Sequence, residues 1–217
     1  METEERLGRY TLVQSDDCFK LGADSLALGR FATVRRGFRV CDLGCGVGTL
    51  LLLLAERADA LALTGIELDA LSAELAGRNL RCNSLDGAIV RGDLRDRSLC
   101  GAGVFDLVVS NPPWFAQGRG KSGGGARCEE TCTLDEVCAS AGYLLKNSGR
   151  FALVHRVERL AEVFAALQAH QMEPKRLQFT QHTPASAPAS VLVEAVRRGK
   201  PGLEVLPPIL LSGTEAL

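Results

Sequence analysis

The feature that most constrains this chain is a glycine-rich turn between two apolar segments. Residues 42–48 read Asp-Leu-Gly-Cys-Gly-Val-Gly. Residues 38–43 have the character of a short strand, and residues 50–57 that of a helix. A strand that reverses sharply into a helix beside a ligand needs residues without a side chain, which glycine supplies. The turn therefore predicts a βα unit with a ligand at its loop.

The same alternation of strand, turn and helix continues along the chain. We expect strands at 38–43, 61–66, 88–91, 105–110, 150–155, 176–181 and 190–196, and helices at 50–57, 70–82, 134–146 and 158–170. Alternating elements predict an α/β fold whose mostly parallel sheet carries helices on both faces. No helix separates the last two strands, so one strand should be antiparallel.

Size and charge limit the possible partners. A chain of 217 residues suits one domain, and its net charge of −1 requires any nucleic-acid contact to come from a local patch. The longest apolar run, 50–55, is too short for a membrane span, and the acidic N-terminus is unlike a signal peptide. We expect a cytoplasmic, single-domain protein without an obligate protein partner.

The eight cysteines are scattered and include no Cys-x-x-Cys pair. A zinc site needs clustered ligands, so we expect reduced thiols and no metal. Prolines 201, 207 and 208 predict an irregular tail over 199–217, after a core spanning 37–198.

Three acids follow consecutive strands and predict a nucleoside pocket. The glycines of the turn have the spacing G-x-G-x-G, which differs from the G-x-G-x-x-G of dinucleotide-binding turns. The nearby Asp42 would repel a pyrophosphate, but it suits a cationic ligand such as a sulfonium with an amino group. Glu67 ends the second strand and can accept hydrogen bonds from two ribose hydroxyls, while Asp93 ends the third and can accept from an adenine amino group. Each acid alone is more often a cap or a surface residue, and the glycines alone fit a plain tight turn. Asp69 is expected to cap the next helix.

A second motif, Asn111-Pro112-Pro113-Trp114, follows the fourth strand. The prolines stiffen the backbone, leaving the Asn111 side-chain oxygen and the Pro112 carbonyl as acceptors. Two acceptors that hold the N–H groups of an amine or amide turn its lone pair toward an electrophilic methyl group. Trp114 offers a flat face for stacking. For Asn-Pro alone, an ordinary strand-ending turn would suffice.

Together these residues resemble the amino-methyltransferases of the class I Rossmann-like superfamily, and more closely the bacterial tRNA1(Val) adenine-N6 methyltransferase family. The resemblance extends over nearly the whole chain, through Gln14, 19–27, 133–135, 149–156, 173–176 and 193–195. It implies a seven-stranded Rossmann-like sheet that binds S-adenosylmethionine, with a target adenine at Asn111–Trp114. The implied cofactor residues are Asp24, Asp42, Gly44, Gly46, Gly48, Glu67, Leu68, Asp93, Leu94 and Asn111. Residues 1–36 are expected to form an N-terminal segment and a helix that close the pocket.

The loop after Trp114 is rich in glycine and carries Arg119, Lys121 and Arg127, which we expect to bind the phosphates of a structured RNA, most simply tRNA. Where the family tends to carry Arg-His-Glu, this chain has Cys128 between Arg127 and Glu129. The motif also fits methylation of a protein glutamine N5 or of a guanine N2 in rRNA, and a cofactor-binding scaffold is the non-enzymatic alternative. His155 is expected to be a packed residue.

Overall fold

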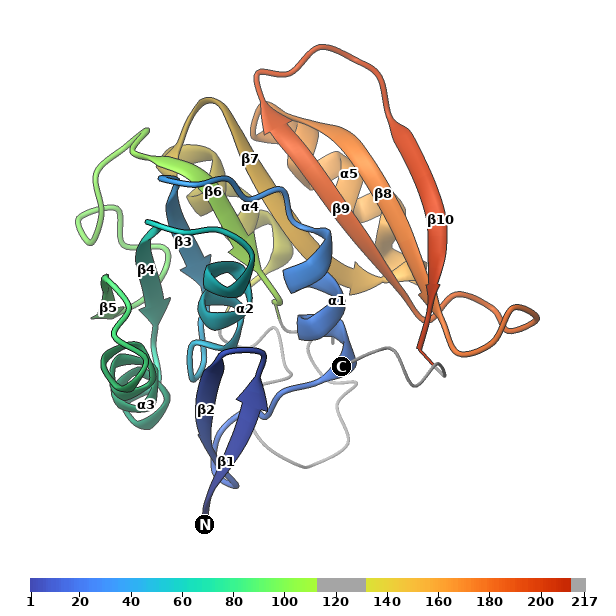
Figure 1. Cartoon of the computed structure of the whole chain (residues 1–217). Helices are drawn as coiled ribbons and strands as arrows, with labels where there is room; N and C mark the ends of the chain where they lie inside the picture. Colours follow the sequence, from blue (N-terminus) through green and yellow to red (C-terminus); the bar gives the residue numbers. More distant parts are fainter. Residues whose placement is uncertain (113–131, 212–217) are drawn as a thin grey trace.

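The protein is built around one central sheet with helices on both faces, described here from a computed structural model (Figure 1). The structure describes residues 1–112 and 132–211. The strands are β1 (Glu2–Leu7), β2 (Tyr10–Ser15), β3 (Arg39–Leu43), β4 (Ala62–Glu67), β5 (Gly87–Arg91), β6 (Phe105–Ser110), β7 (Leu145–Arg156), β8 (Met172–Gln181), β9 (Ser190–Arg197) and β10 (Glu204–Leu210). The helices are α1 (Ala23–Phe31), α2 (Thr49–Arg57), α3 (Ala70–Cys82), α4 (Leu134–Leu144) and α5 (Leu160–Ala169), with a 3₁₀ turn at Val157–Arg159.

The strand order of the large sheet is β10-β8-β9-β7-β6-β3-β4-β5. Neighbouring strands run parallel except β9, which is antiparallel to both β7 and β8. The mostly parallel α/β sheet with one antiparallel strand is therefore confirmed. The first glycine-rich turn follows β3, near the centre of the sheet, where open α/β sheets bind ligands.

The sheet has eight strands among the described residues, where the family resemblance implied seven. The additional strand lies in the tail: β10 pairs in parallel with β8, so the expectation of an irregular segment over 199–217 is wrong for its middle part. The register shifts between Leu206 and Ile209, where Pro207 and Pro208 lie. Prolines are tolerated at such an irregularity of an edge strand, because the outer side of the strand has no neighbouring strand to which backbone N–H groups must donate. The side-chain amide of Gln178 donates to the Pro207 carbonyl at 2.7 Å.

The N-terminal segment contains an unexpected hairpin, β1–β2, which packs near α2 and α3 (Figure 1). Asn79 of α3 is fully buried and ties this hairpin to the glycine-rich turn. Its Nδ2 donates to the carbonyls of Val13 and Val47, both at 2.8 Å, and its Oδ1 accepts from the Val13 amide. The hairpin therefore belongs to the framework that holds the turn.

One helix is shorter than expected. Residues 134–146 were predicted as helical, but α4 ends at Leu144 and Leu145 already pairs with Phe105 of β6. Ser148 adopts a left-handed φ of 63°, so the residues expected to stop the helix form an irregularity within β7. Pairing with β6 decides this boundary, and local propensity does not.

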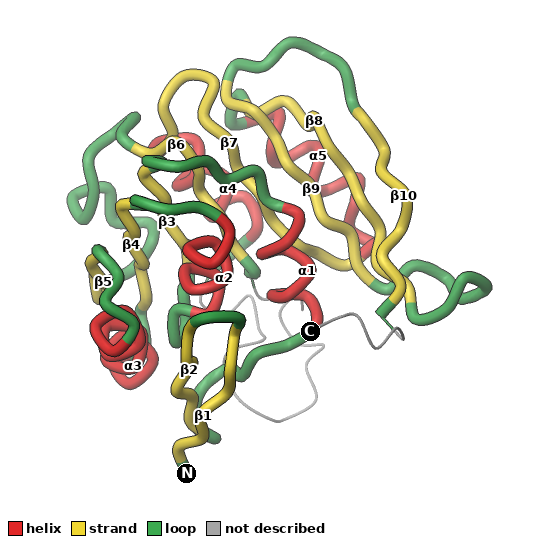
Figure 2. The backbone as a smooth tube through the Cα atoms, viewed as in Figure 1, coloured by secondary structure: helices red, strands yellow, loops and turns green. Residues whose placement is uncertain are grey.

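The core consists of two apolar layers, one on each face of the sheet. Figure 2 shows the helices that lie on both faces of this sheet. Alternate strand residues point to opposite faces. Val40 and Val109 pack with α1, α2 and α3, whereas Cys41 and Val108 pack with α4 and α5. None of the helices in the described parts of the chain combines the length and apolar character that crossing a membrane requires.

Candidate active site

The glycine-rich turn lies at the carboxyl end of β3 and is anchored to the end of β4. The amides of Gly44 and Cys45 donate to the Ile66 carbonyl at 2.9 and 3.1 Å. Gly44, Gly46 and Gly48 have φ values of +71°, +53° and +85°, a region that disfavours residues with a Cβ. A Cβ at Gly44 or Gly46 would meet no atom of the described residues within 4 Å, so no described part of the chain fills the space beside this backbone.

Glu67 lies at the end of β4 and contacts the same turn. One carboxylate oxygen accepts from the Gly46 amide and the other from the Asp69 amide, both at 2.8 Å. Each oxygen can accept a further hydrogen bond, so the half-buried side chain retains capacity for two hydroxyl donors. Asp69 caps α3 by accepting from the Ser72 amide at 2.8 Å, which confirms its expected role.

Asp42 is the most unusual group of the site. Its side chain is 1% exposed, and neither carboxylate oxygen has a hydrogen-bond partner among the described residues. Burial raises the pKa of Asp42 well above its ordinary value, and the nearby negative charge of Glu67 raises it further. A buried carboxylate without a partner is costly, so this position suits a cationic ligand group.

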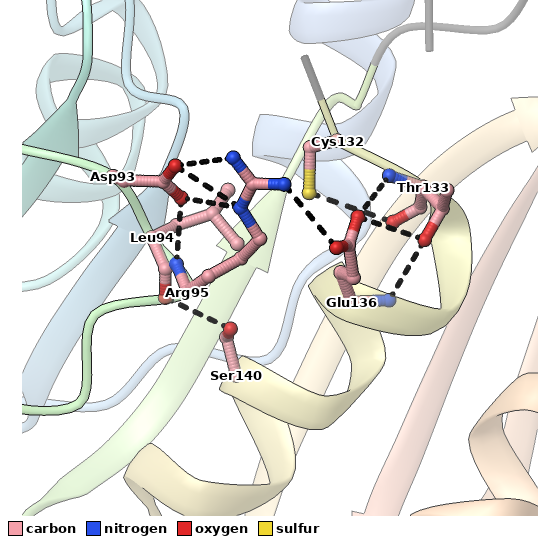
Figure 3. A network of polar contacts seen from close by, with 7 residues as sticks. All are labelled: Asp93, Leu94, Arg95, Cys132, Thr133, Glu136 and Ser140. Atoms are coloured by element: carbon pink, nitrogen blue, oxygen red, sulfur yellow. Dashed lines mark hydrogen bonds and ion pairs between the residues drawn. The ribbon is translucent and has the colours of Figure 1, made fainter. Parts of the chain in front are cut away.

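Asp93 follows β5 and is brought close to Glu67, since the Gly92 amide donates to the Glu67 carbonyl at 2.9 Å. Its carboxylate is engaged by Arg95, whose Nε donates to both oxygens at 2.9 and 3.0 Å (Figure 3). This bond holds the pKa of Asp93 below its ordinary value. A further donor at Asp93 must therefore share the carboxylate with Arg95.

Arg95 also joins Asp93 to the start of α4. Its NH1 lies 3.3 Å from Glu136, which accepts from the amide and hydroxyl of Thr133 in a capping box (Figure 3). Capping by Thr133 and Glu136 explains why α4 begins where it does. No local pattern in the sequence predicted this connection, because Arg95 and Glu136 lie 41 positions apart.

Asn111 follows β6 directly and faces α1. Its Nδ2 donates to the Ser25 hydroxyl at 3.1 Å. The preceding Ser110 donates its hydroxyl to the Leu43 carbonyl at 2.8 Å, which joins the end of β6 to the end of β3. Pro112 is buried. The two remaining residues of the motif, Pro113 and Trp114, lie outside the described residues.

Asp24 lies in the first turn of α1, next to Ser25. Its carboxylate accepts from the Ser190 hydroxyl at 2.7 Å, and the Ser190 and Thr180 hydroxyls lie 2.6 Å apart in the core. These contacts attach the start of α1 to β8 and β9. Asp24 therefore borders the edge that carries Asn111.

The structure gathers most of the expected site at one edge of the sheet. Hydrogen bonds connect the ends of β5, β4, β3 and β6, because Gly92 and Gly46 both donate to Glu67 and Ser110 donates to Leu43. Asp93 and Asn111 directly follow two of these residues in the chain. Leu68 is exposed and Leu94 half-buried beside them. Arg119, Lys121, Arg127 and Cys128 lie outside the described residues.

Sequence reasoning missed Ser25, Asn79 and Arg95 as parts of this framework. Ser25 and Asn111 are 86 positions apart, so no local pattern links them. The one available signal for Ser25 was its place beside Asp24, which the family resemblance had singled out.

His155 is a packed residue, as expected. It is 1% exposed, its Nδ1 accepts from the Arg156 amide at 2.8 Å, and burial lowers its pKa to about 4. We therefore assign this neutral imidazole no catalytic role at the sheet edge that carries Asn111.

Comparison with known proteins agrees with this geometry. The family model described as "Methyltransferase small domain" matches residues 15–175. A tRNA1(Val) (adenine(37)-N6)-methyltransferase from Porphyromonas gingivalis is 32% identical over 200 residues, covering 86% of this chain and 78% of the relative. Its counterpart from Dickeya chrysanthemi is 31% identical, covering 89% and 81%.

Solved structures show the same fold. An enzyme from Agrobacterium tumefaciens described as a predicted O-methyltransferase aligns with a TM-score of 0.72 and 21% identity, covering 88% of this chain and 89% of that one. A methyltransferase from Pyrococcus furiosus aligns with a TM-score of 0.64 and 17% identity, covering 87% and 89%. The Rossmann-like class I architecture is thereby confirmed.

Proposed function

This chain belongs to the methyltransferase small domain family, and from that premise we propose that it methylates the N6 amino group of an adenine in tRNA, with S-adenosylmethionine as the methyl donor. Relatives named tRNA1(Val) (adenine(37)-N6)-methyltransferase align with most of the chain, which supports this substrate class. The observation that carries the proposal is the position of Asn111. It follows β6 directly, beside the turn and acids of β3 and β4.

The proposed cofactor pocket is formed by the glycine turn and the acids around it. The carboxylate of Asp42 would face the positively charged end of the cofactor, and Glu67 would accept from the ribose hydroxyls. Asp93 would share its carboxylate between Arg95 and the adenine amino group. The proposed pocket is completed by Asp24, Leu68 and Leu94, and Asn111 lies at its border, where its side-chain oxygen would face the target amine. When bound, S-adenosylmethionine supplies an electrophilic methyl group on a sulfonium.

The residues of the chain would orient the acceptor. An adenine amino group is a poor nucleophile because its lone pair is delocalised into the ring. Asn111 Oδ1 and the Pro112 carbonyl would accept hydrogen bonds from its two N–H groups and turn the lone pair toward the methyl carbon. After transfer, the methylated nitrogen would release its surplus proton to water. Trp114 would stack on the base.

We further propose that Arg119, Lys121 and Arg127 contact RNA phosphates beside the target base, since the chain's net charge of −1 leaves RNA binding to local patches. We also propose that the protein resides in the cytoplasm, because tRNA is its proposed substrate. The seven cysteines within the described residues are all unpaired, as a reducing compartment would keep them.

The test is transfer of radiolabelled methyl groups to total tRNA, rRNA and protein. The parent should label tRNA at adenine N6, and Asn111→Ala should abolish labelling while cofactor affinity stays within about twofold, because that acceptor serves the target amine. Asn147→Ala, an exposed asparagine in the β7 irregularity, is the control and should retain full activity.

Two further variants address the RNA. Trp114→Ala should weaken target binding by roughly 1–3 kcal/mol if a base stacks there. Neutralising Arg119, Lys121 and Arg127 together should raise the KM for tRNA and flatten its salt dependence. Labelling of a protein glutamine or an rRNA guanine in place of tRNA would refute the substrate assignment, and cofactor binding without any transfer would indicate a scaffold.

A further inference from the structure

We infer that Ser25 is a positioning residue for methyl transfer: its hydroxyl holds the nitrogen end of the Asn111 amide, so that the oxygen end faces the amine to be methylated. This inference rests on the proposed function. Its structural basis is the 3.1 Å hydrogen bond from Asn111 Nδ2 to Ser25 Oγ. Ser25 is 5% exposed, so little water is available to replace it.

The two ends of an asparagine amide differ in what they can do. The oxygen accepts hydrogen bonds and the nitrogen only donates them. A half turn of the amide would present N–H groups to a target amine that itself needs acceptors. In the productive orientation the nitrogen points to Ser25, whose hydroxyl accepts its hydrogen bond. After a half turn the same hydroxyl could donate to the amide oxygen, but the target amine would then face N–H donors in place of an acceptor. Without that hydroxyl, the productive orientation would leave a shielded N–H unsatisfied.

Ser25 can serve as a fixed reference because both ends of α1 are attached to the sheet. At the start of the helix, the neighbouring Asp24 accepts from Ser190 at 2.7 Å. At the other end, Glu194 of β9 accepts from the amide and hydroxyl of Thr33 at 2.7 and 2.9 Å. A side chain on an anchored helix holds its neighbour more tightly than one on a loop.

Further basic groups reinforce the end of α1. Arg57 of α2 donates to the carbonyls of Gly29 and Ala32, and Arg176 of β8 donates to that of Phe31 at 3.1 Å. These bonds satisfy carbonyls that a helix end leaves without partners. The helix that carries Ser25 is therefore attached to α2, β8 and β9 together.

The test compares Ser25→Ala with the conservative Ser25→Thr. Loss of the hydroxyl should lower kcat about tenfold, the factor expected when one hydrogen bond to the catalytic amide is lost. The KM for tRNA, the Kd for S-adenosylmethionine and the thermal midpoint should stay near parental values. Ser25→Thr keeps the oxygen and should restore most of kcat. Ser72→Ala, a serine of similar burial in the first turn of α3, should match the parent.

Three results would overturn the inference: an unchanged kcat in Ser25→Ala, no rescue by Ser25→Thr, or a fall in kcat matched by an equal loss of cofactor affinity and thermal stability. A readout independent of turnover is the side-chain amide signal of Asn111 in ¹⁵N-labelled protein, identified by its absence in Asn111→Asp. Its hydrogen exchange should accelerate in Ser25→Ala. If the parent methylates no tRNA while this exchange still accelerates, the proposed function fails and the Ser25–Asn111 contact stands.

Discussion

Asp42 should couple cofactor binding to the release of a proton. Its carboxyl is buried without a hydrogen-bond partner among the described residues, and burial together with Glu67 raises its pKa well above the ordinary 3.8. Cys41 on the same strand and Cys45 in the turn are buried thiols that supply no compensating positive charge. A positively charged ligand favours the ionised carboxylate and therefore lowers this pKa on binding.

The size of this pH effect on cofactor binding follows from a single titrating group, Asp42. Between the pKa of the bound state and the higher pKa of the free state, binding releases up to about one proton per site. In that range the association constant of S-adenosylmethionine rises with pH, by at most about tenfold per unit. The sign is fixed because the free protein holds the proton more tightly than the complex does.

The assay is titration calorimetry in buffers of different ionisation enthalpy, below about pH 7 so that an α-amino group on the ligand stays charged. The slope of the observed enthalpy against buffer ionisation enthalpy counts the protons exchanged. Asp42→Asn should bind more weakly and lose the slope, whereas Asp59→Asn, at a surface acid, should keep it. Equal enthalpies in all buffers for the parent, or an unchanged slope in Asp42→Asn, would refute this account.

Three more predictions concern affinity and stability. Glu67→Ala should weaken S-adenosylmethionine binding by roughly 1.5–3 kcal/mol for each charged hydrogen bond lost, and unchanged calorimetric affinity would contradict the proposed pocket. Glu194→Gln should cost about 3 kcal/mol in denaturant unfolding, because the fully buried carboxylate pairs with Arg150 at 2.8 Å; Glu162→Gln, at an exposed pair, should change stability by less than about 0.5 kcal/mol. Burial lowers the pKa of His155 from 6.5 to about 4. Between these two pH values the unfolded chain binds more protons than the folded one, so the free energy of unfolding falls as the pH drops from 6.5 to about 4. His155→Phe should remove roughly 3 kcal/mol of this acid-induced loss, and parallel pH profiles for parent and variant would be evidence against it.

The sequence by itself determined those features that depend on near neighbours. The bounds of α3 and β6 match the expected ranges 70–82 and 105–110, since apolar periodicity and flanking turns specify them locally. Asp69 caps α3 from the position immediately before it. The glycine turn, Glu67 at the end of β4 and Asp93 after β5 were predicted to lie at one sheet edge because parallel strands end there together.

Tertiary structure alone decided the rest, since the contacts involved join distant parts of the chain. The prolines of the tail indicated irregular structure, yet β10 forms because β8 offers it a ladder. Asp93 seemed free to bind a ligand until the fold showed its carboxylate engaged by Arg95. Ser25 meets Asn111 across 86 positions. Local propensity specifies where an element begins and ends, but the partner of a side chain depends on which elements the packed sheet brings together.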